Sequence, residues 1–297
     1  MTNNLRNRAM LADLTIRKAP TKKSDKEASK ATAQAHGASA EMWTTTKSLL
    51  PPDAPKLVKL NKIAGQMSTR HRELTLPWLD SGPRILSASP AHYFQYRQEM
   101  DQFAADYLAA ADDLADDYLN LQAQAARLQG TAYNPDEYLS KEEFRRRFAA
   151  GVNILPMPDV DDMRYAIGDA ELERIKQDTQ STLNAALDLA MADVWKRIQT
   201  VVAAMVDGLK DYDEKIKNNI PGQKGSFRDT LVENVRDLVA ILPSLNITDN
   251  QDLKDFTTLM QGTLCRYDAE QLRVNSGTRE NVTAAAASIL EQMSEFI

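Results

Sequence analysis

An eleven-residue repeat between residues 183 and 216 places the strongest constraint on the fold of this chain. Apolar residues recur at this spacing in three sets, which are Leu183, Val194, Met205 and Ile216; Leu187, Ile198 and Leu209; and Ala190, Val201 and Tyr212. This period keeps an apolar stripe straight or slightly right-handed along an α-helix. We therefore expect one helix of roughly 48 residues that begins near Asp169 and is about 70 Å long, at 1.5 Å per residue.

A second apolar seam, with a seven-residue period, precedes this repeat. Its members are Ala104, Ala111, Tyr118 and Ala125, interleaved with Tyr107, Leu114, Leu121 and Leu128. Heptad spacing is typical of a helix that packs along another helix. Both seams are too apolar to remain in water alone. We therefore predict a mainly α fold with a minor β component (α+β), elongated, in which the two long helices pack together beside short helices and a small sheet.

Shorter elements complete the predicted fold. Strands are expected at residues 10–18 and 83–88, and a strand or extended segment at 152–158. Ser140 and Glu143 form the pattern of a capping box, which starts a short helix. Further helices are expected near residues 54–74, 228–242, 250–265 and 278–296.

The chain lacks the residue patterns of an enzyme or a metal site. His36, His71 and His92 stand in unrelated segments, and the loop at residues 222–226 lacks the spacing of a phosphate-binding P-loop. We therefore expect no catalytic residue, no metal and no cofactor. The single cysteine, Cys265, excludes an intrachain disulfide. The polar N-terminus MTNNLRNRAM does not fit a signal peptide or a membrane span, so we expect a cytoplasmic protein without membrane contact.

Basic and acidic residues are divided unevenly along the chain. Residues 1–98 carry 16 Lys and Arg against 7 Asp and Glu, whereas residues 99–297 carry 20 against 35. We divide the chain accordingly into a basic α+β portion, 1–98, and an acidic long-helix portion, 99–297, that fold together as one unit. A local positive surface attracts a polyanion whatever the net charge of the protein, so nucleic acid would bind the basic portion. Two ordinary solvated faces would give the same totals.

Cations and aromatic rings are the groups that bind single-stranded nucleic acid, through phosphates and stacked bases respectively. We predict a first basic patch of Lys18, Lys22, Lys23, Lys26, Lys30, Lys59, Lys62, Arg70, Arg72 and Arg84. A second patch would consist of Arg145, Arg146, Arg147, Lys215, Lys217 and Lys224. The candidate base-stacking rings are Trp78, Tyr93, Phe94 and Tyr96. Lys23, Lys26 and Lys30 have the spacing of one helical face, which is also typical of a solvated face, and the rings also fit a buried core.

The order of several motifs resembles an uncharacterised protein family of tailed bacteriophages. The motifs are MLADLTIRKAPTKKSDKEAS, KSLLPPD, LTLPWLDSGPRILSASPAHYFQYRQEM, EEFRRRF, ILPMPDVDDMRYAIGDAELERI, VWKRIQTVVAAMVDGL and LPSLNITDNQDLKDF. One branch of this family is similar to single-stranded-DNA-binding RNA polymerase cofactors of podoviruses that carry a virion RNA polymerase. The resemblance implies a phage protein of the host bacterial cytoplasm. Its implied partners are single-stranded DNA and a phage-encoded RNA polymerase that transcribes the middle genes.

A non-enzymatic structural adaptor, or a partner of an AAA+ ATPase, is the alternative function. The long helices favour it, as does an acidic helix face whose members are Asp101, Asp106, Asp112, Asp113, Asp116 and Asp117. The sequence leaves open whether a second copy of the chain is also a partner. It also leaves open whether the acidic, apolar C-terminal end recruits a protein or is a last core helix, since Ile289, Met293 and Phe296 have helical spacing.

Overall fold

The computed structural model describes residues 5–79, 82–158, 168–217 and 227–293, and they form two compact units. Unit 1 comprises Met1–Asp13, Arg72–Phe94 and Ile154–Ile297, and unit 2 comprises Leu14–His71 and Gln95–Asn153. Each unit thus contains residues from both sides of position 98, where the charge balance changes. The class is mainly α with a minor β component, as predicted.

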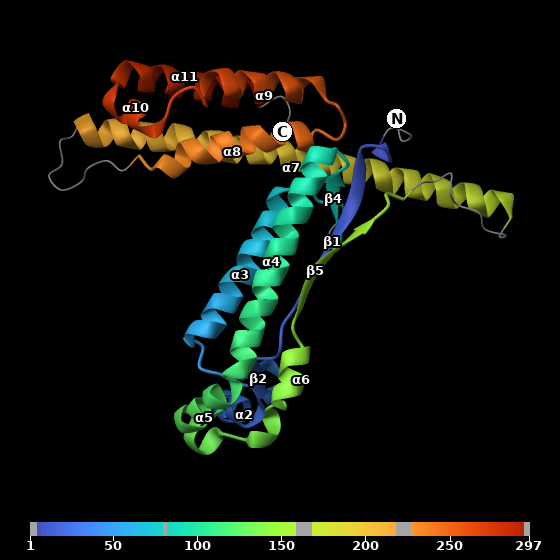
Figure 1. Ribbon diagram of the computed structural model, residues 1–297, viewed down its shortest axis with the longest axis vertical. Coiled ribbons are helices and arrows are strands. Elements are labelled where there is room, and N and C mark those ends of the chain that lie inside the picture. The colour runs from blue at the N-terminus through green and yellow to red at the C-terminus, as the bar shows by residue number, and fades with distance from the viewer. Residues whose placement is uncertain (1–4, 80–81, 159–167, 218–226, 294–297) are drawn as a thin grey trace. The chain divides into compact units, whose positions relative to one another are not determined.

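The helices and strands succeed one another along the chain as labelled in Figure 1. The strands are β1 (Ala9–Arg17), β2 (Lys22–Asp25), β3 (Thr45–Ser48), β4 (Arg84–Ser87) and β5 (Ala149–Leu155). The α-helices are α2 (Lys26–Ala35), α3 (Pro55–Glu73), α4 (Pro90–Asp116), α5 (Tyr118–Gln129), α6 (Lys141–Arg146), α7 (Asp169–Lys217), α8 (Asp229–Leu245), α9 (Gln251–Thr263), α10 (Ala269–Val274) and α11 (Ser276–Met293). Short 3-10 turns are η1 (Ala40–Met42), η2 (Gly130–Ala132) and η3 (Pro135–Glu137).

Helix α7 of unit 1 confirms the eleven-residue repeat. It begins at Asp169, as predicted, and runs for 49 residues. Most of the stripe is buried: Leu183, Val194 and Met205 belong to one core with residues of α8, α9 and α11. Helices α8 and α11 pack along α7 (Figure 1). The stripe ends at the surface, because Ile216 is exposed at the C-terminal end of the helix.

The heptad seam lies in unit 2 and is divided between two helices. Asp117 separates α4 from α5, so the single predicted helix is interrupted at its centre. Tyr107, Leu114 and Leu121 are buried in a core that also contains residues of α3 and α6. Leu128, the last predicted member of the seam, is exposed.

The two seams therefore pack differently from the prediction. Each seam belongs to a separate core. The stripe of α7 packs with residues of α8, α9 and α11, whereas the seam of α4 and α5 packs with residues of α3 and α6. The prediction that the two long helices pack along each other's seams is corrected, because shorter helices of the same unit cover each seam.

Two small sheets supply the β component. The strand order β4-β1-β5 makes the larger sheet, in which β1 and β4 are antiparallel with Ala9 opposite Ser87. These two strands confirm the predictions at residues 10–18 and 83–88. The second sheet contains β2 and β3, antiparallel with Lys22 opposite Ser48 and Lys23 opposite Lys47. Lys23 therefore lies on a strand, which corrects its predicted place on a helical face with Lys26 and Lys30.

The C-terminal helix α11 packs into the core of unit 1. Ile289 and Met293 are buried, as expected for a last core helix, whereas Phe296 lies outside the described residues. Helix α10 is an addition to the three short helices predicted for this region. No helix in the described part of the chain is long and apolar enough to cross a membrane.

Candidate nucleic-acid interface

Many of the predicted cations are occupied by carboxylates of the same unit. The Arg70 guanidinium donates two hydrogen bonds to Glu99, at 2.5 and 3.0 Å. Arg145 lies 3.0 Å from Asp112 and 2.7 Å from Asp116. Other predicted cations in ion pairs are Lys59 with Asp113, Arg147 with Glu143 and Lys215 with Asp211. A cation in such a pair offers a phosphate a weaker potential, because its partner cancels much of its field.

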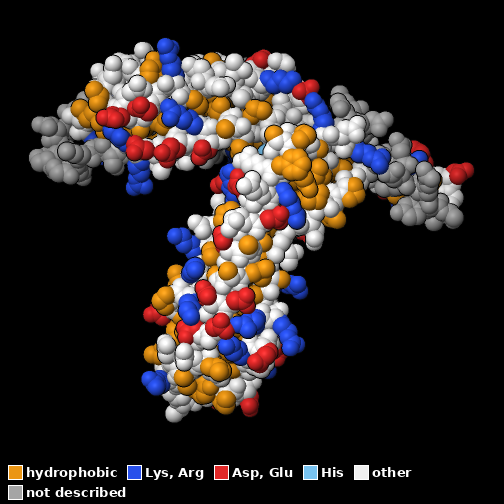
Figure 2. All heavy atoms as spheres, in the orientation of Figure 1, with side chains coloured by type: hydrophobic (Ala, Val, Ile, Leu, Met, Phe, Trp, Pro, Cys, Tyr) orange, Lys and Arg blue, Asp and Glu red, His pale blue; other side chains and the backbone are white. Residues whose placement is uncertain are grey.

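The acidic face of α4 is the source of many of these partners. Lys56, Lys59 and Lys141 join Arg145 in pairing with Asp112, Asp113, Asp116 and Asp117. Hydrogen bonds from Lys141 and Arg145 hold the pKa of the Asp116 carboxyl below its usual value. Figure 2 shows blue and red side chains interspersed over the region of α3 and α4. Four aspartates of this predicted acidic face are thus paired within unit 2.

Three further predicted cations serve internal contacts. Lys18 donates to the amide oxygen of Asn61 at 3.0 Å, and the Arg84 Nε donates to Thr75 Oγ1 at 2.8 Å. Lys23 lies 3.9 Å from Glu137, which is also 2.7 Å from Lys47. Because Lys23 and Lys47 are directly opposite in the β2–β3 pair, Glu137 reduces the repulsion between these like charges.

Lys22, Lys26 and Lys30 differ from the paired cations. All three are exposed, and none has a side-chain hydrogen bond or ion pair to a residue that the structure describes. Lys62 and Arg72 on α3 and Arg146 on α6 share this property, but they lie on other elements than the three lysines. Lys224 and the side chain of Lys217 lie outside the described residues. The structure thus leaves three neighbouring lysines, at positions 22, 26 and 30, available to an anion.

These three lysines are carried by residues 22–48, which form β2, α2, η1 and β3 and are called the β2–β3 motif below. The Asp25 carboxylate caps α2 by accepting a hydrogen bond from the Ala28 N–H at 2.9 Å. The buried Ser29 hydroxyl then joins α2 to β3, since it accepts from the Thr45 N–H at 2.8 Å. These contacts hold α2 against β3, with Lys22 at the start of β2 and Lys26 and Lys30 one turn apart on α2.

The charge around the β2–β3 motif is positive. Residues 22–48 carry five Lys and Arg and three Asp and Glu. Of the three acids, Asp25 is the helix cap, while Glu27 and Glu41 are exposed. The motif therefore has a small positive net charge, and three of its five lysines have no side-chain partner among the described residues.

Two of the four predicted stacking rings are buried and are corrected here. Trp78 is 7% exposed and Tyr96 is 0% exposed, and the Tyr96 hydroxyl lies 2.7 Å from His71 Nδ1. Neither ring can receive a base without opening the core. Phe94 is 67% exposed and half-buried Tyr93 packs edge-on against it, with ring centroids 5.4 Å apart. These two rings stay candidates by exposure, but they belong to unit 1 and the β2–β3 motif belongs to unit 2.

The exposed ring that sequence reasoning missed is Trp43, between η1 and β3. It is 37% exposed and stacks on His36, with centroids 5.1 Å apart and an interplanar angle of 18°. One feature of the sequence indicates that this ring is exposed. Trp43 stands in a stretch rich in Ala, Ser, Thr and Gly, which offers few apolar partners for a core.

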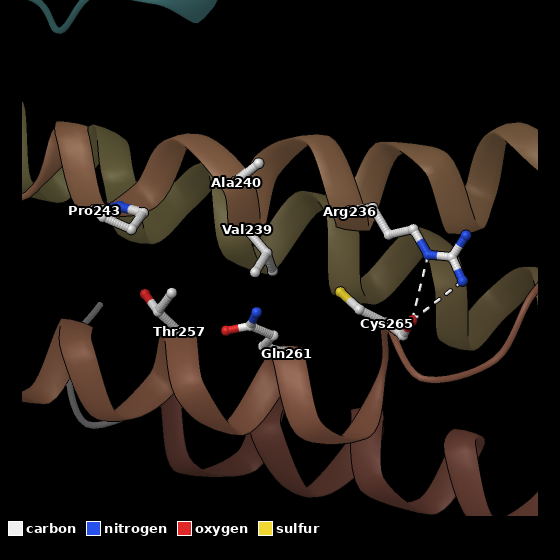
Figure 3. Close-up of a pocket in the computed structure, with 7 residues that line it drawn as sticks. All are labelled: Arg236, Val239, Ala240, Pro243, Thr257, Gln261 and Cys265. Carbon is white, nitrogen blue, oxygen red and sulfur yellow. Dashed lines mark hydrogen bonds between the residues drawn. The ribbon is translucent and has the colours of Figure 1, made fainter. Parts of the chain in front are cut away.

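One hollow in the described part of unit 1 offers no catalytic group. It is a groove of about 460 Å³ in unit 1 between α8 and α9, with Cys265 at one end (Figure 3). Arg236 is engaged there by the carbonyl oxygens of Cys265 and Tyr267. Burial raises the pKa of the Cys265 thiol, which keeps it in the weakly nucleophilic protonated form. The described residues contain no cluster of His, Cys, Asp and Glu that would hold a metal ion.

The fold and these side chains define a mainly α protein whose β2–β3 motif presents unpaired lysines. Comparison of the chain with models of protein families, with curated protein sequences and with solved structures finds no match.

Proposed function

We propose that this protein binds single-stranded DNA through the β2–β3 motif and acts as a transcription cofactor for a phage-encoded RNA polymerase. One observation supports the binding most: Lys22, Lys26 and Lys30 are exposed and unpaired among the described residues, while many other predicted cations have internal partners. The resemblance to the phage family supports the polymerase as partner.

The chemistry of the motif suits a sequence-tolerant contact. Lysine ammonium groups bind phosphates as point charges, and they release the counterions that surround the strand. Affinity of this origin falls steeply with salt and depends little on base sequence. A cofactor that holds a template or displaced strand near a polymerase needs contacts of this kind.

The adaptor alternative has lost one of its two supports. Its acidic face on α4 is largely paired with Lys56, Lys59, Lys141 and Arg145 of the same unit. That face therefore offers a basic partner little unpaired charge.

Fluorescence anisotropy with labelled single-stranded and double-stranded DNA of equal length tests the binding. We expect Lys22→Glu/Lys26→Glu/Lys30→Glu to lose at least about tenfold in single-strand affinity at moderate salt. The matched control is Lys196→Glu/Lys210→Glu/Arg228→Glu, which changes the net charge equally at exposed unit 1 positions and should bind within about twofold of the wild type. Equal losses in both variants would refute the assignment to the β2–β3 motif.

Transcription by a small phage-encoded RNA polymerase on a single-stranded template tests the cofactor role separately. We expect the wild-type protein to increase product and the triple lysine variant to fail to do so. Strong DNA binding without any effect on transcription would refute the cofactor role and leave the binding intact.

A further inference from the structure

The stacked pair of Trp43 and His36 lies at the surface of the β2–β3 motif. Trp43 is 37% exposed, and the other two tryptophans, Trp78 and Trp195, are 7% and 5% exposed. Residues 34–44 are exposed at every position, so this loop has the environment of a surface and not of a core. An indole left in water forgoes the burial that the other two tryptophans obtain.

The geometry of the pair leaves an aromatic face available. The His36 and Trp43 rings are nearly parallel, at 18°, so the imidazole covers one face of the indole. His36 ends α2, and its backbone N–H bonds to carbonyl oxygens of the last helical turn. This cap fixes the backbone of His36, and the imidazole lies stacked on the indole. A preordered ring with free aromatic surface is the arrangement on which an unpaired base stacks.

The charge of this loop suits a base, whereas the charge of the three lysines suits phosphates. Residues 34–44 contain no Lys or Arg and contain Glu41, so a phosphate would be repelled there. The lysines lie close by, since His36 is six residues after Lys30 and therefore roughly 9 Å further along the axis of α2. A strand whose phosphates contact the lysines would thus bring a base, and not a phosphate, to the loop.

We propose that Trp43, supported by His36, is a stacking platform for one unpaired base of single-stranded DNA. This inference rests on the proposed DNA binding and adds the group that selects single strands. The bases of a duplex are already stacked on one another, so they cannot occupy the platform without unpairing. The contact is expected to be tolerant of sequence, because every base has an aromatic face.

Two oligonucleotides with the same number of phosphates test the platform: oligothymidylate and an abasic strand of equal length. The wild type should bind oligothymidylate more tightly by on the order of tenfold, the expected contribution of one stacked base. Trp43→Leu should lose this preference and bind both strands as weakly as the wild type binds the abasic strand. Trp43→Phe should recover part of the preference, and Met42→Ala, a truncation of the exposed neighbour, should retain all of it.

Tryptophan emission supplies a second readout. Since Trp78 and Trp195 are buried, we expect oligothymidylate but not the abasic strand to quench the emission, and the quenching to vanish in Trp43→Leu. Salt-dependent binding with equal affinity for both strands and no quenching would refute the platform alone. Absence of binding to either strand would refute the proposed function as well. An unchanged circular dichroism spectrum of Trp43→Leu establishes that a lost preference is not a loss of fold.

Discussion

The Arg145 guanidinium lies 2.7 Å from the Asp116 carboxylate, and this pair connects α6 with the acidic face of α4. Arg145 also contacts Asp112, and Lys141 contacts Asp116. Basic and acidic side chains of unit 2 therefore partly neutralise each other. Sequence composition counts such charges as a basic and an acidic surface, but the folded unit presents much less of either.

This pairing predicts that Arg145 contributes little to DNA binding. We expect Arg145→Gln to bind single-stranded DNA within about twofold of the wild type, because its charge is already compensated by two carboxylates. Lys26→Gln removes one unpaired charge and should weaken binding several-fold. Anisotropy titrations of the two variants at the same salt concentration make the comparison, and a larger loss in Arg145→Gln would contradict it.

The buried Arg279 predicts an unequal effect of two neighbouring aspartates on α7. The Arg279 Nε donates to Asp213 at 2.6 Å, and its guanidinium carbon lies 5.1 Å from the centre of the Tyr212 ring. Asp213→Ala leaves a buried charge without its counterion and should lower the free energy of unfolding by about 3 kcal/mol. Asp211→Ala removes only an exposed pair with Lys215 and should cost less than about 0.5 kcal/mol. Urea unfolding of both variants measures the difference, and equal values would contradict this role for Arg279.

Two helical glycines make a matched pair for a second stability test. A Cβ added at Gly65 of α3 meets nothing within 4 Å, whereas one added at Gly208 of α7 would lie 2.5 Å from Cδ1 of Leu231. Gly65→Ala should raise the free energy of unfolding by about 1 kcal/mol through helix propensity. Gly208→Ala should fall short of that increase, because the Leu231 side chain must move. Identical increases would show that α7 and α8 are not packed as described.

Asp249 predicts a pH effect in unit 1. Hydrogen bonds from Lys254 and Arg8 lower the pKa of its carboxyl from the ordinary value of 3.8. A carboxyl whose pKa is lowered by folding stabilises the fold at pH values above its ordinary pKa. This contribution is lost as the pH falls through the pKa of the folded state. Lys254→Ala should therefore raise the pKa of Asp249 toward 3.8, as followed by NMR titration. An unchanged pKa in that variant would rule out Lys254 as the main cause.

Periodic burial explains why the long helices could be predicted from sequence. A repeat such as Leu183, Val194 and Met205 is a local property of one helix, and it predicts the buried stripe of α7. The partners of that helix are set by contacts far apart in the chain, which no period encodes. The apolar pattern therefore predicts that the two seams pack against each other. In the structure α8 and α11 cover the stripe of α7, and α3 covers the seam of α4 and α5.

The sequence predicts that the candidate site is basic, but it does not predict the secondary structure or the exposed ring of that site. The spacing of Lys23, Lys26 and Lys30 predicts a helical face, but Lys23 lies on β2. This strand has only four residues, and it forms by pairing with β3, in which Lys47 lies opposite Lys23, so no local pattern indicates it. Likewise, exposure depends on the tertiary fold, so Trp78 resembled a platform while Trp43 was overlooked. The sequence predicts a first patch of ten cations, and only their tertiary contacts distinguish Lys22, Lys26 and Lys30 from the paired ones.

The salt dependence of single-strand affinity measures how many phosphates the three lysines contact. Each phosphate contact contributes a slope of about −0.7 to the plot of log Kobs against log salt concentration for single strands. We expect Lys22→Glu/Lys26→Glu/Lys30→Glu to have a slope shallower than that of the wild type by about 2, since three contacts are lost. The control Lys196→Glu/Lys210→Glu/Arg228→Glu should keep the wild-type slope. Equal slopes for the wild type and the triple lysine variant, measured between about 50 and 200 mM salt, would contradict the account.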